Sequence, residues 1–183
     1  MKIEVLSRAK KKKFVEGLSE FGISSIPQML VRSGTERIRA FSGDLTREEI
    51  MDLWHILPIE GVGLYVGKDM INRNGVHEIR LSLDGMHVWK EQLEADISKK
   101  AEGGRRKAAR VVLLNEEQEV DWFLGRDVEL DEEQGKIGEG FVSVKAGEDF
   151  VGVGKIGGGN SVVGGRMLFG FLPKERRRKE RMS

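Results

Sequence analysis

The placement of glycine constrains this 183-residue chain more than any other feature. Before residue 98, apolar residues recur at helical spacing, with a few short strand-like runs between them. After Gly125, short β-rich runs are separated by glycine-rich turns, a pattern typical of a small barrel. We therefore expect an α+β protein in which an N-terminal α/β domain is followed by a small β-barrel. The length suffices for two small domains.

The N-terminal half predicts helices alternating with strand pairs. Helices are expected at 7–21, at 46–56, where Thr46 and Glu49 form a capping box, and from Ser82 to about residue 97. The predicted strand pairs are 29–31 with 38–41 and 62–66 with 78–81. The stretch 98–110 is charged and has little apolar content, so we predict a basic linker there, between domains at 1–97 and 111–183.

The C-terminal half predicts one helix among strands. Asn115 and Gln118 provide the capping box of a helix over 116–124, which follows a strand at 111–114. Further short strands are expected at 128–130, 141–144, 150–156, 162–163 and 167–172.

The net charge of +1 hides separated blocks of opposite sign. Basic residues concentrate at 10–13, 99–110 and 174–181, and acidic residues at 116–149. Basic blocks can form a phosphate-binding face, but such runs are also common as solvated helix faces or chain ends. The acidic helix at 116–121 would repel RNA, so we expect it to lie away from any bound strand.

Composition excludes several classes of protein. The absence of cysteine excludes disulfides, cysteine-based zinc sites and cysteine nucleophiles. No apolar run approaches the roughly 20 residues that cross a bilayer, so we expect a cytoplasmic protein without membrane contact. With four Asn and four Gln among many Glu, Lys and Arg, the composition is weakly typical of a thermophile.

Gly152, Gly154 and Gly157 match the G-x-G-x-x-G pattern of dinucleotide-binding loops. Such a loop needs a helix directly after it, because the pyrophosphate binds at that helix's N-terminus. Here a glycine-rich turn follows instead, so we expect the glycines to allow sharp bending in a barrel and predict no nucleotide cofactor.

The three histidines show no metal-binding spacing. His55, His77 and His87 form neither an H-x-H nor an H-E-x-x-H motif, so we predict no metal. Asp84, close to His87, is interpreted as a first-turn helix acid, and no nucleophile elbow accompanies the pair. We therefore predict no catalytic residues.

Most aromatic residues lie in apolar stripes. Trp54, Trp89, Trp122 and Phe123 are expected in the core rather than in a base-stacking surface. For Tyr65 and Phe169 the sequence leaves both orientations open.

The C-terminal half resembles a PUA domain, an RNA-binding module. The likeness rests on WFLGRDV at 122–128, GFVSVK at 140–145, DFVGVGKI at 149–156 and FLPKERR at 171–177. The last segment is similar to the end of the PUA-like module of Sun-family RNA cytosine methyltransferases.

The first half resembles the domain that precedes PUA in that module and in ribosome-assembly factors. The matching segments are RIRAFSG at 37–43, VGLYVGK at 62–68 and IRLSLDG at 79–85, so the likeness spans about residues 28–178. Two departures stand out. The chain lacks the cysteine with which Sun-family enzymes attack cytosine and has no room for a methyl-donor domain, and the stretch 157–165 is richer in glycine than in the assembly factors.

The resemblance implies a monomeric RNA-binding protein without catalytic activity of its own. It would act in ribosome biogenesis, in rRNA processing, or in rRNA or tRNA modification, with RNA-modification enzymes or pre-ribosomal proteins as further partners. Two alternatives stay open: an accessory protein-interaction subunit of a methyltransferase or assembly complex, and a small enzyme of unrecognised type. The basic residues expected to contact RNA are Lys155, Arg166, Lys174, Arg176, Arg177, Arg178, Arg105, Arg106 and Lys107.

Overall fold

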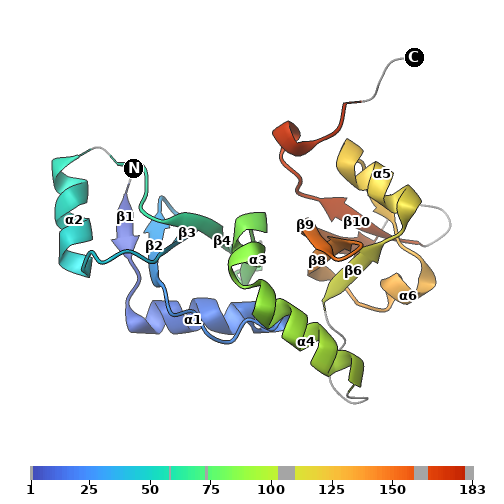
Figure 1. Cartoon of the computed structure of the whole chain (residues 1–183), viewed down its shortest axis with the longest axis horizontal. Helices are drawn as coiled ribbons and strands as arrows, with labels where there is room; N and C mark the ends of the chain where they lie inside the picture. The colour runs from blue at the N-terminus through green and yellow to red at the C-terminus, as the bar shows by residue number, and fades with distance from the viewer. Residues whose placement is uncertain (1, 58, 73, 103–109, 159–164, 180–183) are drawn as a thin grey trace. The chain divides into compact units, whose positions relative to one another are not determined.

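The chain forms two compact units, Met1–Ala95 and Asp96–Ser183, each with its own five-stranded sheet (Figure 1). The computed structural model describes residues 2–57, 59–72, 74–102, 110–158 and 165–179. Helices and two separate sheets confirm the predicted α+β class. No helix in these ranges is both long and apolar enough to cross a membrane.

The sheet of the first unit is antiparallel throughout, in the order β1-β2-β3-β4-β5. Its strands are β1 (Ile3–Val5), β2 (Met29–Ser33), β3 (Arg37–Phe41), β4 (Leu64–Ile71) and β5 (His77–Leu81). The two predicted strand pairs therefore form, with somewhat different ends. The edge strand β1 is not predicted by the sequence, because three residues are too few to show alternation.

Helices cover both faces of this sheet. α1 (Arg8–Leu18) continues into a 3₁₀ turn at Ser19–Phe21 and packs against β5, and α3 (Leu83–Val88) packs against β4. α2 (Arg47–Ile56) packs against β1, where Ile50 joins a buried cluster with Val31. Leu30 is also buried, and neighbouring strand residues point to opposite faces, so each face has apolar residues to bury.

The helix expected to end near residue 97 differs from the structure in two ways. It is broken at Trp89 into α3 and α4 (Lys90–Glu102), and α4 continues into the stretch expected to be a linker. Along the chain, the boundary between the two units falls within α4. The other predicted caps are present: Thr46 with Glu49 and Asn115 with Gln118 both form complete capping boxes.

A chain of ion pairs runs across the first sheet. Arg32 lies between Asp69, 2.6 Å away, and Glu4, 3.9 Å away, and Lys10 of α1 donates a hydrogen bond to Glu4. This hydrogen bond holds the pKa of the Glu4 carboxyl below its usual value, against the opposing effect of partial burial. The ionised carboxylate is thus favoured by folding.

Lowering the pH should therefore reduce the stability of the first unit, because Glu4 becomes protonated. A carboxyl whose pKa is lowered by folding contributes stability above its unfolded-state pKa, and that contribution is lost as the pH falls through the folded-state pKa. We expect Glu4→Gln to reduce the loss of stability between neutral and acid pH, measured by urea unfolding. Glu60→Gln, which removes an exposed carboxylate, serves as the control. An unchanged pH dependence in Glu4→Gln would contradict the assignment.

The sheet of the second unit has the order β6-β8-β9-β10-β7 and curls into a half-barrel. β6 runs parallel to β8 and the other pairs are antiparallel. The strands are β6 (Val111–Leu114), β7 (Val128–Glu129), β8 (Gly140–Ala146), β9 (Asp149–Gly158) and β10 (Arg166–Gly170). Its helices are α5 (Glu116–Leu124), the short α6 (Glu132–Gly135), which the sequence did not predict, and a 3₁₀ turn at Lys174–Arg176. The strand predicted at 162–163 lies outside the described residues.

Glycines of β9 and β10 make room for the core of this unit. Trp122 of α5 is 1% exposed, and a Cβ on Gly152 or Gly170 would lie 2.9 or 3.1 Å from its ring. A Cβ on Gly154 would lie 2.4 Å from Leu168 Cδ1. The glycines of the G-x-G-x-x-G match thus lie within a strand rather than in a loop, and two of them are required by core packing.

Candidate nucleic-acid interface

The basic residues selected from the sequence fall at three places. Lys155 lies on β9 and Arg166 begins β10. The 3₁₀ turn after β10 contains Lys174 and Arg176, and it is followed directly by Arg177 and Arg178. The linker residues Arg105, Arg106 and Lys107 lie outside the described residues, so the structure bears only on the first two places.

Lys155 lies between two phenylalanines in one row across three strands. In register, Lys155 is opposite Phe141 of β8 on one side and Phe169 of β10 on the other. Its ammonium group is 5.0 Å from the centre of the Phe141 ring, a cation–π distance. The next residues, Ile156 and Leu168, are in the core, so the row lies on the other side of the sheet.

Phe171 extends this row at the end of β10. It is 40% exposed, and its ring centre is 5.7 Å from that of Phe141. The ring of Phe169 lies against Gly157, where a Cβ would approach within 3.2 Å. Phe141, Lys155 and Phe169 are each half-buried and so keep part of their surface accessible. We call Phe141, Lys155, Phe169 and Phe171 the aromatic row.

On its side of the sheet, the aromatic row is the accessible stretch of these strands. Further along the same strands, Ser143 and Val153 are 2% and 5% exposed, so that stretch is closed to a ligand. What remains accessible is a set of rings around one cation. Rings can stack with planar bases, and an ammonium group can neutralise a phosphate next to a stacked base.

Arg166 does not share this side of the sheet with Lys155. Arg166 is opposite Gly158 and lies two residues before the buried Leu168, so its side chain points to the core side. Its Cδ lies 3.9 Å from the Cβ position of Gly135 in α6. Lys155 and Arg166, both expected to contact RNA, therefore point to opposite sides of the sheet, because successive strand residues alternate between its two sides.

The basic tail after β10 docks on α5. Arg177 Nε donates a hydrogen bond to the Leu172 carbonyl (3.1 Å), and its side chain covers Gly125, where a Cβ would lie 2.5 Å from Cδ. The Arg178 amide donates to the Phe123 carbonyl (2.7 Å), and its guanidinium lies 4.8 Å from the Phe123 ring centre. The tail is thereby anchored through its backbone and two side chains.

This docking changes the roles expected for the tail. Arg178 also lies 3.8 Å from Glu119, so part of the basic tail contacts the acidic helix that was expected to lie away from RNA. Arg177 covers the C-terminal end of α5 and is half-buried, whereas Lys174 and Arg176 are exposed on the 3₁₀ turn. Of the tail residues, Lys174 and Arg176 are the better placed to meet phosphates.

Lys174 and Arg177 should therefore respond differently to replacement by alanine. Arg177→Ala removes a hydrogen bond and packing, and we expect it to lower the stability of the second unit by about 1–2 kcal/mol. Lys174→Ala, which removes an exposed cation, should change stability by less than about 0.5 kcal/mol and lower the salt slope of RNA binding by about 0.7. Urea unfolding and RNA titrations at several salt concentrations separate the two effects. Equal stability losses in both variants would contradict the assignment.

The histidines occupy the elements expected for them: His55 on α2, His77 at the start of β5 and His87 on α3. His55 Nδ1 lies 2.6 Å from the Met51 carbonyl, and His77 Nδ1 lies 2.9 Å from Asp69. Within the part of the chain that the structure describes, no cluster of three or more His, Cys, Asp or Glu suits a metal. The absence of a metal in the protein stays a prediction.

The aromatic predictions are confirmed where the side chains are buried. Trp89 and Trp122 are 3% and 1% exposed, and Trp54 packs at the margin of the first unit's cluster. Of the two residues left open, Tyr65 is half-buried on β4 and Phe169 belongs to the aromatic row. Phe141 and Phe171 were not among the residues selected from the sequence.

Taken together, the second unit offers a stacking surface on one side of its sheet and exposed cations on the adjoining tail. No protein-family model matches the chain, and a search of curated proteins finds no match. The chemistry of this surface and the resemblance of the motifs are therefore what indicates a function.

Proposed function

We propose that this protein binds RNA through the aromatic row and has no catalytic centre of its own. The observation that carries the proposal is the cross-strand arrangement of Phe141, Lys155 and Phe169 on the side of the sheet away from the core. Base–aromatic stacking contributes about 1–3 kcal/mol per base, and it requires unpaired bases whose faces are free. The ligand is thus a single-stranded RNA segment.

The segments that resemble a PUA domain include strands that carry the aromatic row, which supports the proposal. The segments that carry it, 140–145 and 149–156, correspond to β8 and β9, which supply two members of the row. We propose that the half-barrel is a PUA-like domain, that the first unit is the domain preceding it, and that the protein acts in rRNA or tRNA maturation.

Titration of the full chain with a short fluorescent single-stranded RNA tests this function. We expect affinity to fall with salt, with a slope of about 0.7 per phosphate contact, and to be lower for the same sequence in a duplex. Undetectable binding, or binding indifferent to salt, would overturn the proposal.

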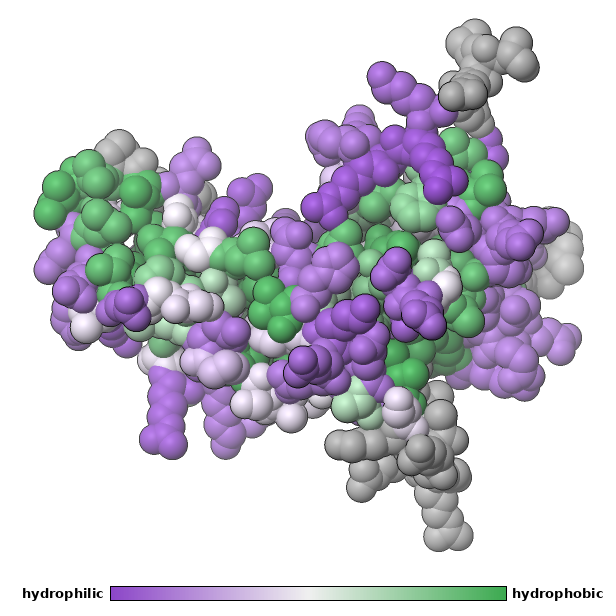
Figure 2. Space-filling view, viewed as in Figure 1, coloured by the Kyte–Doolittle hydropathy of each residue, from purple (hydrophilic) through white to green (hydrophobic). Residues whose placement is uncertain are grey.

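The alternative role, as an accessory interaction subunit, is favoured by an apolar patch on the first unit. Exposed apolar side chains gather over α2 and its neighbours (Figure 2): Leu45, Ile56, Leu57 and Leu64, with Ile56 76% exposed. Exposed carboxylates of Asp44, Glu48, Asp52 and Glu60 lie near them in the chain. Such a patch fits a basic amphipathic segment of an RNA-modification enzyme or pre-ribosomal protein. Failure of salt-dependent RNA binding, with loss of a co-purified partner in Ile56→Ser, would favour this role.

A further inference from the structure

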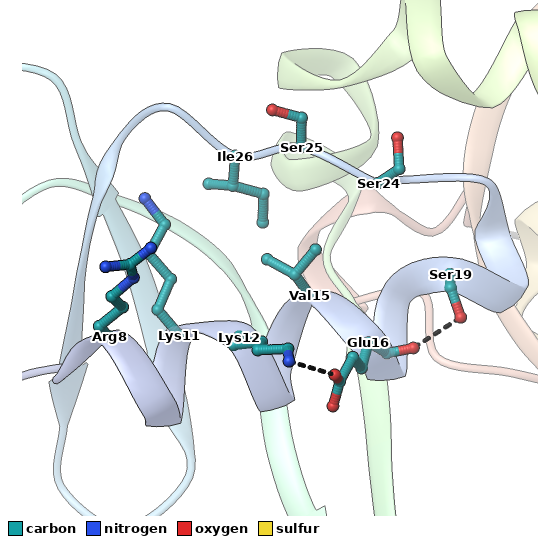
Figure 3. Close-up of a pocket in the computed structure, with 9 residues that line it drawn as sticks. All are labelled: Arg8, Lys11, Lys12, Val15, Glu16, Ser19, Ser24, Ser25 and Ile26. Atoms are coloured by element: carbon teal, nitrogen blue, oxygen red, sulfur yellow. Dashed lines mark hydrogen bonds and ion pairs between the residues drawn. The ribbon is translucent and has the colours of Figure 1, made fainter.

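A groove of about 490 Å³ lies on the first unit between α1 and the segment 22–28 (Figure 3). One wall is a single stripe of side chains that begins at Arg8 of α1 and ends at Ser19, the first residue of the 3₁₀ turn. The other wall is formed by Ser24, Ser25 and Ile26. The volume falls within the range of small-molecule sites, about 300–1,000 Å³.

A glycine turn, a buried isoleucine and a glutamine from α4 fix the position of the second wall. Gly22 has a left-handed φ of 80°, which reverses the chain after α1, and the fully buried Ile23 anchors the return. Gln92 of α4 then fixes the segment. Its Oε1 accepts hydrogen bonds from the amides of Ser24 and Ser25 (3.0 and 3.1 Å), and its Nε2 donates to the Ser25 carbonyl (2.8 Å). The groove is thus built by specific side-chain contacts.

The lysine run 10–13 divides between the groove and other surroundings. Lys11 and Lys12 line the groove, together with Arg8. Lys10 pairs with Glu4, and Lys13 is exposed elsewhere on α1. Lys11 donates to the Gln28 carbonyl (2.8 Å), so its ammonium group is held at the groove. Lys12 forms an ion pair with Glu16, 3.8 Å away (Figure 3), so Arg8 and Lys11 are the two cations that provide a site for a phosphate.

The rest of the groove suits a ribonucleoside. Half-buried Val15 and buried Ile26 provide an apolar surface. Beyond them lies the carboxylate of Glu16, which is paired with Lys12 and has further lone pairs that can accept hydrogen bonds from ribose hydroxyls. Eight residues separate Arg8 from Glu16, about 12 Å along the helix, a length comparable to one nucleoside monophosphate.

We propose that this groove binds one ribonucleotide unit, with its phosphate at Arg8 and Lys11 and its ribose toward Glu16. The inference goes beyond the aromatic row, which lies on the other unit. The chemistry required is a phosphate monoester on a ribose, as in a free ribonucleotide or at the 5′ end of an RNA strand.

Titration of the full chain with AMP, dAMP and inorganic phosphate, followed by NMR shifts of the amides of α1 and of residues 22–28, tests the site. AMP should bind more tightly than dAMP, because only AMP carries the 2′-hydroxyl, and more tightly than phosphate alone. Arg8→Ala should weaken AMP binding at least about tenfold. Lys13→Ala, a matched loss of charge outside the groove, should leave binding unchanged, and Glu16→Gln should reduce the preference for AMP over dAMP.

Two further arms complete the design. If a short RNA with a 5′-phosphate shifts the groove amides at lower concentration than AMP does, and the same RNA with a 5′-hydroxyl does not, the ligand is a strand end. If AMP shifts them at lower concentration, the ligand is the free nucleotide. Phe169→Ala should weaken RNA binding and leave the AMP-induced shifts of the groove amides unchanged, so failure of the RNA proposal is distinguishable from failure of this one. The inference is overturned if AMP shifts no groove amide, if Lys13→Ala weakens binding as much as Arg8→Ala, or if AMP and dAMP bind equally. Thermal unfolding shows whether each variant is folded.

Discussion

Replacement of Trp122 by alanine is expected to lower the free energy of unfolding of the second unit by about 3–5 kcal/mol. The side chain is 1% exposed and lies in a core cluster with Val142, Ile156 and Leu168. The glycines that face its ring leave space shaped for an indole, and a shortened side chain would leave that space as a cavity. Most of a small domain's stability would thereby be lost.

Trp122→Phe provides the matched comparison. Among the described residues, the indole Nε1 of Trp122 is buried and has no hydrogen-bond partner. Phenylalanine keeps much of the apolar area and removes this unpaired N–H group, so its loss of stability should be clearly smaller. Hydrogen exchange of the β8 and β9 amides reports on the second unit separately from the first. A loss below about 1 kcal/mol in Trp122→Ala would show that α5 is not essential to this core.

Local rules predicted the elements of the fold well. Thr46 and Asn115 mark helix starts because a short polar side chain and a Glu or Gln three residues later satisfy free backbone amides, a relation contained within four residues. β6 spans 111–114 as predicted, because its apolar run is bounded by charge and a cap. β1 and α6 are only three and four residues long, and over so few residues the sequence pattern does not distinguish a strand or helix from a loop.

The candidate site was harder to predict because it depends on registers between strands. Lys155 was selected for its charge alone, and its neighbours Phe141 and Phe169 lie 14 residues away on either side. In GFVSVK, strand alternation places Phe141 on one side of the sheet and Val142 and Val144 on the other, which was the available signal for an exposed Phe141. Apolar residues on both sides of the strand obscured this signal.

The tail shows a second limit of sequence reasoning. Charge predicted that Arg176, Arg177 and Arg178 act together, whereas only tertiary contacts reveal that Arg177 covers Gly125 and that Arg178 lies over Phe123. A triple alanine variant would therefore mix lost phosphate contacts with weakened packing. Single variants are needed to separate them.

The largest effect on binding is expected from Phe141→Ala/Phe169→Ala. Each ring can stack with one base, and the loss of one stacked base costs about 1–3 kcal/mol, so the double variant should bind single-stranded RNA at least about 30-fold more weakly. Both rings are half-buried on the side of the sheet away from the core, so the fold should survive their truncation. The salt slope should change little, because neither ring carries charge.

Lys155→Ala gives the complementary result, since it removes a cation and leaves the rings in place. We expect a smaller loss of affinity together with a salt slope lower by about 0.7. Lys145→Ala, which removes a lysine positioned over Phe150, and Leu113→Ala, which removes an exposed apolar side chain from β6, control for charge and apolar area on the same sheet. RNA titrations at several salt concentrations, with circular dichroism of each variant, provide the measurement. If the double phenylalanine variant is folded and binds RNA as tightly as Leu113→Ala does, base stacking on the aromatic row is ruled out. RNA binding would then have to depend on phosphate contacts by the exposed tail residues.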